Sequence, residues 1–312
     1  MKRQKQNNFW DMFLKHLANR LQEPDENLHS VRVVSEVTLK RLCRDVAGEI
    51  DTPKSSRPAG PAMVRHLVES GLARQLPVEV SGKPTGKTRI YALGFGAQRM
   101  APAPVEILQA AEPGGVACYF AAIDFYELTT QLPTYHHVAV PTEYNTPLAL
   151  EPVIGASADR TEGGERLGTL MFRYDGVPYY RTHRDARLLP GVQRRRFGDS
   201  IIRITTLEQT LLDTLHHPAS CGGAAVIFEA WETAWERINQ DRLADYLGSI
   251  KHGPLRRRVG CICDRLGLDR TRRLKEFLDK LKGEVSGDTP VVTLLKGIDG
   301  QELNSDWQVL EI

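Results

Sequence analysis

Apolar residues recur at helical spacing in three segments near the start of the chain. In residues 7–21 they form one stripe, and in residues 35–50 they form a second face that Ser35 can cap. Residues 52–60 contain two prolines and a glycine, which interrupt the helical pattern, and residues 61–70 resume it. We therefore expect three helices. The first must bury its stripe either within its own domain or against a second copy of the chain.

A strand, a loop and a second strand are predicted directly after the third helix. Residues 76–80 and 88–93 have strand-like composition, and residues 81–87 form a turn rich in glycine and lysine. Helix, turn, helix and a basic-tipped hairpin is the order of a winged helix-turn-helix. The loop also resembles a phosphate-binding P-loop, but three residues separate its glycines where four are needed, and it leads into a strand. We expect no nucleotide there.

The rest of the chain mixes strand and helix patterns. Residues 116–128, apolar and rich in alanine and aromatic residues, predict a buried helix, and Thr205 with Glu208 has the spacing of a capping box that opens another. Glu208 and Asp213 would point about 140° apart on that helix, so one active site cannot easily use both. Strands are expected at 136–140, 168–173 and 201–204, and helices dominate from there through residue 281.

These patterns predict an α+β fold in three parts. Residues 1–27 are the N-terminal amphipathic helix, residues 28–100 the winged helix-turn-helix, and residues 101–312 a larger mixed α/β domain. The composition, 41% hydrophobic and 26% charged over 312 residues, is that of a globular chain. The sequence shows no apolar run of bilayer-spanning length and no secretion signal, so we expect a cytoplasmic protein with no membrane partner.

Candidate chemistry is sparse. The five cysteines have neither the number nor the spacing of a disulfide or zinc framework, so we expect no metal and no cofactor. The sequence also lacks a nucleophile elbow, a His-Glu-x-x-His motif, a kinase His-Arg-Asp triplet and a dinucleotide-binding glycine motif. We therefore expect a protein that is not an enzyme.

Positive charge is concentrated near the start of the chain. Residues 1–100 hold 17 lysines and arginines against 10 acidic residues, whereas the remainder holds 24 against 29. Because phosphates attract cations, double-stranded DNA is the expected partner, although winged helices also serve protein contacts. The cations expected to hold phosphates are Lys54, Arg57, Arg65, Lys83, Lys87 and Arg89. Ser55, Ser56 and His66 are expected at base edges or the nearby backbone.

Two further basic runs lie in the second part of the chain. Residues 193–196 contain three consecutive arginines between predicted strands, and residues 255–275 are strongly basic. The second run has two interpretations: another surface for anions, or a solvated helix face whose charge is partly neutralised by nearby acidic residues. The candidates for such a patch are Arg256, Arg257, Arg258, Arg272 and Arg273.

Three regions make the chain resemble the AbiEi-type antitoxins of bacterial abortive-infection toxin–antitoxin systems. The first is the winged region through Tyr91, and the second is residues 117–132, which look like the family's alanine-rich helix and Leu-Thr-x-Gln stretch. The third, residues 205–223 (TTLEQTLLDTLHHPASCGG), is similar to its Thr-x-x-x-Thr-Leu-x-Asp helix with a Pro and Gly-Gly ending. The closing segment Asn304–Trp307 is also similar, whereas the leading helix and the Pro-rich turn depart from the pattern.

The resemblance implies a phage-defence function in two parts. The N-terminal domain would bind inverted repeats in its own promoter and repress its operon. The C-terminal domain would counter a nucleotidyltransferase-like toxin encoded alongside, without a stable complex with it. The alternative is a ligand-responsive transcription regulator, whose C-terminal domain would bind an effector in a pocket lined by Tyr119, Phe120, Phe125, Tyr179 and Tyr180.

Overall fold

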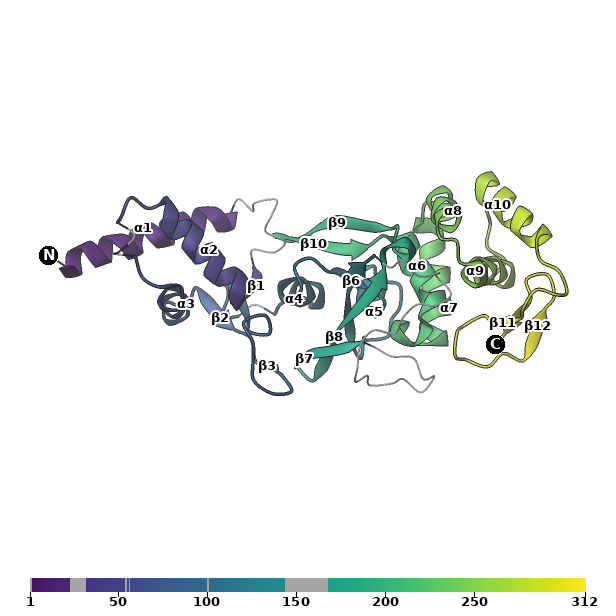
Figure 1. Ribbon diagram of the computed structural model, residues 1–312, viewed down its shortest axis with the longest axis horizontal. Helices are drawn as coiled ribbons and strands as arrows, with labels where there is room; N and C mark the ends of the chain where they lie inside the picture. Colours follow the sequence, from purple (N-terminus) through teal and green to yellow (C-terminus); the bar gives the residue numbers. More distant parts are fainter. Residues whose placement is uncertain (1, 23–31, 54, 56, 100, 144–167) are drawn as a thin grey trace. The chain divides into compact units, whose positions relative to one another are not determined.

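A computed structural model describes the chain apart from residues 1, 23–31, 54, 56, 100 and 144–167 (Figure 1). The protein is α+β, with helices and several sheets. It divides into two compact units. The first unit consists of Met1–Gly114, Met171–Val177 and Arg194–Arg203, and the second of Gly115–Leu170, Pro178–Gln193 and Ile204–Ile312.

Three helices form in the first unit where the apolar periodicity predicts them. They are α1 (Lys2–Gln22), α2 (Glu36–Glu49) and α3 (Gly60–Glu69). Ser35 is the N-cap of α2, as expected, because its Oγ accepts a hydrogen bond of 3.4 Å from the backbone N–H of Thr38. A shorter helix, α4, spans Pro104–Ala111.

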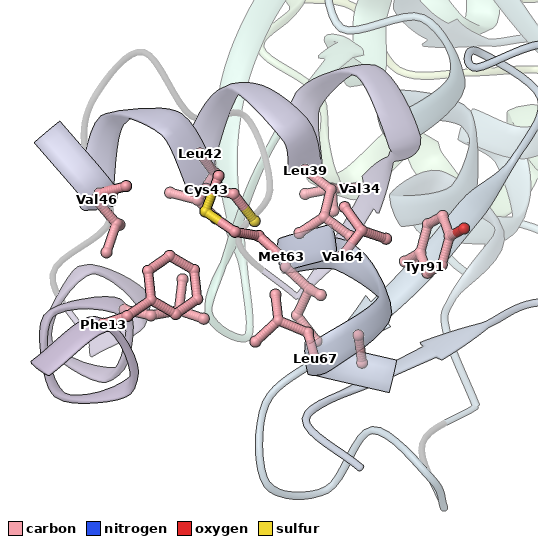
Figure 2. Close-up of a cluster of buried hydrophobic side chains, with 14 of the residues drawn as sticks. Phe13, Val34, Leu39, Leu42, Cys43, Val46, Met63, Val64, Leu67 and Tyr91 are labelled. Carbon is pink, nitrogen blue, oxygen red and sulfur yellow. The ribbon is translucent and has the colours of Figure 1, made fainter. Parts of the chain in front are cut away.

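One apolar cluster joins these three helices (Figure 2). Phe13 of α1, Leu42 of α2 and Met63 of α3 all contribute side chains that are at most 4% exposed. At the far end of α2, Glu49 accepts a hydrogen bond of 2.9 Å from Arg20 of α1. The stripe of the first helix is therefore buried within its own unit, the first of the two alternatives.

A three-stranded antiparallel sheet completes this part of the first unit. Its order is β1-β4-β2, with Val33 opposite Ala92 and Ala73 opposite Leu93. The central strand is therefore the last of the three in the sequence. The bounds are Val33–Ser35 for β1, Ala73–Gln75 for β2 and Ile90–Leu93 for β4.

The hairpin predicted before β4 is wrong in its first strand. Its partner is β2, whereas β3 (Val78–Glu79), which lies in the predicted segment 76–80, pairs with β7 (Thr169–Tyr174). The backbone N–H of Leu76 still donates to the carbonyl of the first residue of β4 at 2.8 Å. Pro77 follows, and a proline has no N–H with which to continue the ladder.

In the second unit β6 lies between β8 and β5, and β5 also pairs with Ile204, near the end of β10, most of which belongs to the first unit. β6 runs parallel to β8 and antiparallel to β5, and β5 pairs in parallel with β10. β9 lies beside β10 at the edge of the sheet. The strands predicted at 136–140, 168–173 and 201–204 are confirmed as β6, β7 and β10. The bounds are Val116–Cys118 for β5, His136–Thr142 for β6, Val177–Asp185 for β8, Val192–Phe197 for β9 and Ser200–Thr205 for β10.

The continuous helix predicted for residues 116–128 is wrong. Its first residues form β5, and only Phe120–Phe125 form a helix, α5. Tyr119 separates the two with a φ of 56°, in the left-handed region that a helix cannot continue through. Every residue of β5 is buried, and a short apolar run buried on both faces cannot be distinguished from a buried helix by periodicity.

Helices form most of the rest of the second unit. The expected capping box at Thr205 is displaced by one residue: Thr206 is the N-cap of α6, and its Oγ1 accepts from the backbone N–H of Gln209 at 3.2 Å. Glu208 instead accepts from the backbone N–H of Asn239, the N-cap of α8, at 2.8 Å. The helices are α6 (Leu207–His216), α7 (Ala224–Ala234), α8 (Gln240–Ser249), α9 (Gly253–Arg265) and α10 (Arg272–Gly283), and short 3-10 turns cover Ala186–Leu188, Pro218–Cys221 and Trp235–Arg237.

A small sheet of order β11-β13-β12 closes the chain, with β11 at Val292–Thr293, β12 at Glu302–Asn304 and β13 at Val309–Glu311. Trp307, just before β13, is buried to 1% exposure, and the Cβ of any larger residue at Gly260 of α9 would lie 2.3 Å from its ring. The glycine therefore allows α9 to approach the tryptophan closely. Among the helices in the described residues, none has an apolar stretch long enough to cross a bilayer.

A buried ion pair lies in the second unit. The guanidinium of Arg184, on β8, contacts both carboxylate oxygens of Asp213, on α6, at 2.7 and 2.8 Å. Gln209, one turn earlier on α6, donates to the same carboxylate at 2.8 Å. Glu208 and Asp213 therefore have separate partners.

Candidate nucleic-acid interface

The outer face of α3 carries Pro61, Ala62, Arg65, Val68 and Glu69, all exposed. Its inner face is formed by Met63, Val64 and Leu67, which are buried in the cluster of Figure 2. On the opposite side Ala62 and Arg65 are exposed. Val68 and Glu69, three and four residues after Arg65, are exposed beside it on the helix. Val68 is apolar, yet its side chain is 41% exposed, whereas that of Met63 is buried.

His66 contacts another helix of the same unit. Its ring stacks on that of Trp10 in α1, with the ring centroids 3.9 Å apart and the planes at 27°. The histidine is half-buried, and one face of its ring is covered. The structure therefore gives His66 a role in fixing α1 against α3, which the expectation of a base contact did not include.

The arginine in the turn between α2 and α3 donates hydrogen bonds to nearby backbone carbonyls. The guanidinium of Arg57 donates to the carbonyls of Thr52 and Ile50, at 3.1 and 3.2 Å. Ile50 is the C-cap of α2, where backbone carbonyls have no partner within the helix. Arg57 therefore ties the turn to the helix end, with two of its guanidinium nitrogens bonded inside the protein. Ser55 is exposed, whereas Lys54 and Ser56 lie outside the described residues.

The loop between β3 and β4, residues 81–87, which we call the wing, is attached at its base to the start of α2. The backbone N–H groups of Glu36 and Val37 donate to the carbonyls of Arg89 and Gly86, at 2.8 and 3.3 Å. The carboxylate of Glu36 contacts Arg89 at 2.7 Å and Lys40 at 2.5 Å. Two cations beside it therefore hold the pKa of Glu36 below its ordinary value, through the hydrogen bond from Lys40 first, against a partial opposing effect of burial.

The ion pair with Glu36 changes the expected role of Arg89. The sequence analysis counted it with Lys83 and Lys87 as a third wing cation, but its guanidinium is paired with Glu36. The two lysines are exposed, and they remain the candidate phosphate ligands of the wing. Arg89 positions the wing that carries them.

Two exposed cations were missed. Arg41 and Arg44 lie three residues apart on α2, and both side chains are exposed. Their spacing on the polar side of the predicted helix was a signal that could have identified them. Among the described residues of α2, α3 and the wing, the exposed basic ones are therefore Arg41, Arg44, Arg65, Lys83 and Lys87.

The structure does not bring together the five arginines of the expected second patch. Arg257 is buried and donates to the carbonyls of Trp307, Gln308 and Pro290, and Arg258, also buried, donates to those of Thr293 and Leu215. These bonds attach α9 to the closing sheet, because several backbone carbonyls converge where one guanidinium can reach them.

The other three arginines of that patch also have nearby partners. Arg256 donates to the carbonyls of Leu247, Gly248 and Ile250, near the end of α8. On α10, Arg272 pairs with Glu276 and Arg273 with Asp245. Only Arg272 and Arg273 therefore fit the interpretation of a solvated helix face neutralised by acidic residues, whereas Arg256, Arg257 and Arg258 bond to backbone carbonyls.

The aromatic residues proposed for an effector pocket are packed. Tyr119, Phe120, Tyr179 and Tyr180 are each at most 3% exposed. The ring of His137 lies between Tyr119 and Tyr180, at centroid distances of 5.3 and 5.4 Å. Phe125 is half-buried beside Tyr126. These contacts are those of a core, and they favour a structural role for the cluster.

Comparisons with known proteins support the fold alone. The sequence matches no protein-family model and no curated protein. Among solved structures the chain is similar to one described as the crystal structure of RV2827C protein from Mycobacterium tuberculosis. The alignment covers 95% of this chain and 89% of that chain, with 16% sequence identity and a TM-score of 0.50. At this identity the likeness extends to the arrangement of the chain and leaves its family and its function to other arguments.

Proposed function

We propose that the chain binds duplex DNA through α3 and the wing, represses its own operon at inverted repeats in the promoter, and acts as an antitoxin. The observation that carries the DNA-binding half is the outer face of α3. There Arg65 is exposed beside the small Ala62, in the same unit as the wing lysines Lys83 and Lys87. A helix with this face can enter a major groove, and an arginine can contact guanine through two hydrogen bonds.

The order of elements gives further support. A helix, a strand, two helices and three strands follow one another from α1 to β4, and the sheet order is β1-β4-β2. A winged helix-turn-helix has this order, with its second packed helix available to the groove and the wing beside it. The attachment of the wing to α2 through Glu36 and Arg89 would hold both contact elements in a fixed relation.

The net charges of the two units differ more than the net charges of residues 1–100 and residues 101–312. The residues of the first unit include 22 lysines and arginines and 14 aspartates and glutamates, a net charge of +8. Those of the second unit include 19 and 25, a net charge of −6, which together give the +2 of the whole chain. Phosphate backbones would attract the first unit and repel the second.

Gel shifts with a DNA fragment from upstream of the gene test the DNA-binding half. Replacing Arg65 by alanine is expected to cost about 1–3 kcal/mol and to relax the sequence preference, if the arginine contacts a base. The double variant Lys83→Ala/Lys87→Ala is expected to bind all sequences more weakly and to reduce the slope of log K against log salt by about 2. The matched control is Lys275→Ala/Lys280→Ala, which removes two exposed lysines of α10.

Two outcomes would contradict DNA binding through this surface. One is the absence of any shift by the unaltered protein at low salt. The other is an equal loss of affinity in the α10 control, since that result would assign the binding to overall charge.

The antitoxin half follows from the resemblance to the AbiEi-type family, and it has its own experiment. The full chain is co-expressed with the neighbouring gene, which is expected to encode a nucleotidyltransferase-like toxin. Growth should be restored, without co-purification of the two proteins. The Arg65→Ala variant should restore growth as well, because the proposal assigns repression and neutralisation to different parts of the chain. A neighbouring metabolic operon, or no rescue, would contradict it.

A further inference from the structure

Phe95 lies exposed on a hydrogen-bonded turn of the first unit. It directly follows β4 between Gly94 and Gly96, and its side chain is 89% exposed, the largest exposed fraction given for any large apolar residue among those described. The N–H of Gly94 donates to the carbonyl of Leu72 at 2.9 Å, and Arg74 donates to the carbonyl of Ala97 at 2.8 Å. The turn is therefore ordered by its backbone, and the ring contributes little to folding.

A single exposed aromatic residue is ordinary, but this one lines a hollow with charged residues. The hollow has a volume of about 440 Å³, and its walls include Phe95, Arg32, Arg99 and Asp199. We call these four residues the Phe95 surface. A hollow of this size is in the range of sites that hold one small organic group, such as a base.

Positive charge continues from this hollow along the edge strand β9. Arg194, Arg195 and Arg196 are all exposed, and they form the basic run that the proposed duplex interface does not use. The hairpin of β9 and β10 returns to the hollow: Arg196 donates to the carbonyl of Gly198 at 3.3 Å, and a Cβ placed on Gly198 would lie 3.1 Å from the guanidinium of Arg32.

The Phe95 surface is separate from the wing. β4 begins at Ile90, just after the wing, and ends at Leu93, just before Phe95. The two therefore lie at opposite ends of one strand, about 10 Å apart along four residues. A ligand at the hollow need not compete with DNA at α3.

We infer that the Phe95 surface binds a single-stranded nucleic acid, with one base stacked on Phe95 and its phosphates at Arg32 and Arg99. An exposed aromatic ring flanked by arginines is the arrangement that binds unpaired bases, since any base has a face to stack and the arginines attract the backbone. Asp199 can accept a hydrogen bond from an exocyclic amino group. A duplex would leave the ring without a base face, because its bases stack on each other.

Fluorescence anisotropy with labelled twelve-nucleotide strands tests this, using the full chain. The probes are oligo-dT, oligo-dA and oligo-rA, which distinguish DNA from RNA and bases with an amino group from those without, and a twenty-base-pair duplex. Phe95→Ala is expected to weaken single-strand binding about 5- to 150-fold and to leave duplex binding unchanged. The matched control is Leu132→Ala, which removes an apolar side chain that is 86% exposed in the second unit.

Two more variants distinguish aromatic stacking from nonspecific hydrophobic contact. Phe95→Trp should retain single-strand binding, whereas Phe95→Leu, which keeps an apolar side chain without a π face, should lose it. Arg195→Gln/Arg196→Gln should flatten the salt dependence of single-strand binding. Because Phe95 is exposed, none of the Phe95 variants should change the thermal midpoint.

The proposal is overturned if the unaltered protein binds no single strand at low salt, or if Phe95→Ala binds it as well as the unaltered protein does. A loss of duplex binding alone in Phe95→Ala would assign the surface to the duplex and also overturn it. Duplex and single-strand binding are measured separately, so failure of one leaves the other standing.

Discussion

Replacing Asp213 by alanine is expected to lower the free energy of unfolding of the second unit by about 3–5 kcal/mol. The carboxylate is 1% exposed and the guanidinium of Arg184 is 3% exposed, so neither is solvated by bulk water. Burial by itself lowers the pKa of Arg184, but attraction by Asp213 outweighs it, and the pKa lies well above its ordinary value. Without Asp213 the arginine keeps its charge in a site that contains no counter-charge.

The loss arises from the uncompensated charge, which gives the experiment its control. The double variant Arg184→Met/Asp213→Leu removes both charges at similar volume, and we expect it to recover most of the stability. Arg272→Ala, which breaks an exposed ion pair with Glu276, should leave the unfolding midpoint almost unchanged.

Tryptophan fluorescence in urea can follow this unit. Trp231, Trp235 and Trp307 lie in the second unit, and only Trp10 lies in the first, so a Trp10→Phe background reports on the second unit alone. A loss of less than 1 kcal/mol in Asp213→Ala would show that water or another group solvates Arg184. A double variant as unstable as the single one would show that packing, and not charge, is the cause.

The local pattern of the chain predicts the elements whose apolar residues have a clear period. The three N-terminal helices occur as predicted because each buries one stripe, and Ser35 caps the second of them. The strand at 116–118 was misassigned because its neighbours on both sides in the sheet are distant in the sequence. The segment itself contains no pattern that indicates burial on both faces.

The candidate interface was predicted in outline, and its details depended on tertiary partners. Arg65 and Arg57 look alike as basic residues near the third helix, yet one is exposed and the other is bonded to two carbonyls. Arg89 and Lys87 differ in the same way, because Glu36, more than fifty residues earlier, reaches only Arg89. The charge of a residue can be read from the sequence, whereas its partner depends on the fold.

The exposure of Phe95 also depends on the fold. An aromatic residue at the end of an apolar strand is expected to be buried, and the strand before it is buried throughout. The two glycines beside Phe95 were the signal that the chain turns there, since Gly94 has a φ of 104°. The exposure of the ring follows from that turn.

Acidification from pH 6.5 to pH 5 is expected to destabilise the second unit through its buried histidines. Burial lowers the pKa of His136 and of His252 to about 4, and Arg258, Lys296 and His217 contribute further to the shift at His252. Burial, with His217, Arg184, His252 and Lys296, also lowers the pKa of His216.

The sign follows from proton binding. Unfolded histidines have a pKa near 6.5, so between pH 6.5 and 4 the unfolded chain binds more protons than the folded chain, and stability falls as the pH falls. Each such histidine contributes a slope of up to about 1.4 kcal/mol per pH unit. Above pH 5 the carboxylates with lowered pKa, such as Asp185 and Asp264, stay ionised in both states and add little.

His252→Asn isolates one of these contributions. The Nδ1 atom of His252 caps α9 by accepting from the backbone N–H of Leu255 at 3.2 Å, and asparagine can make the same cap without titrating. We expect the variant to be about as stable as the unaltered protein at pH 7.5 and to lose about 1.4 kcal/mol per pH unit less between pH 6 and 5. An unchanged slope in His252→Asn would mean that His252 is solvated and protonates in the folded state as readily as in the unfolded chain.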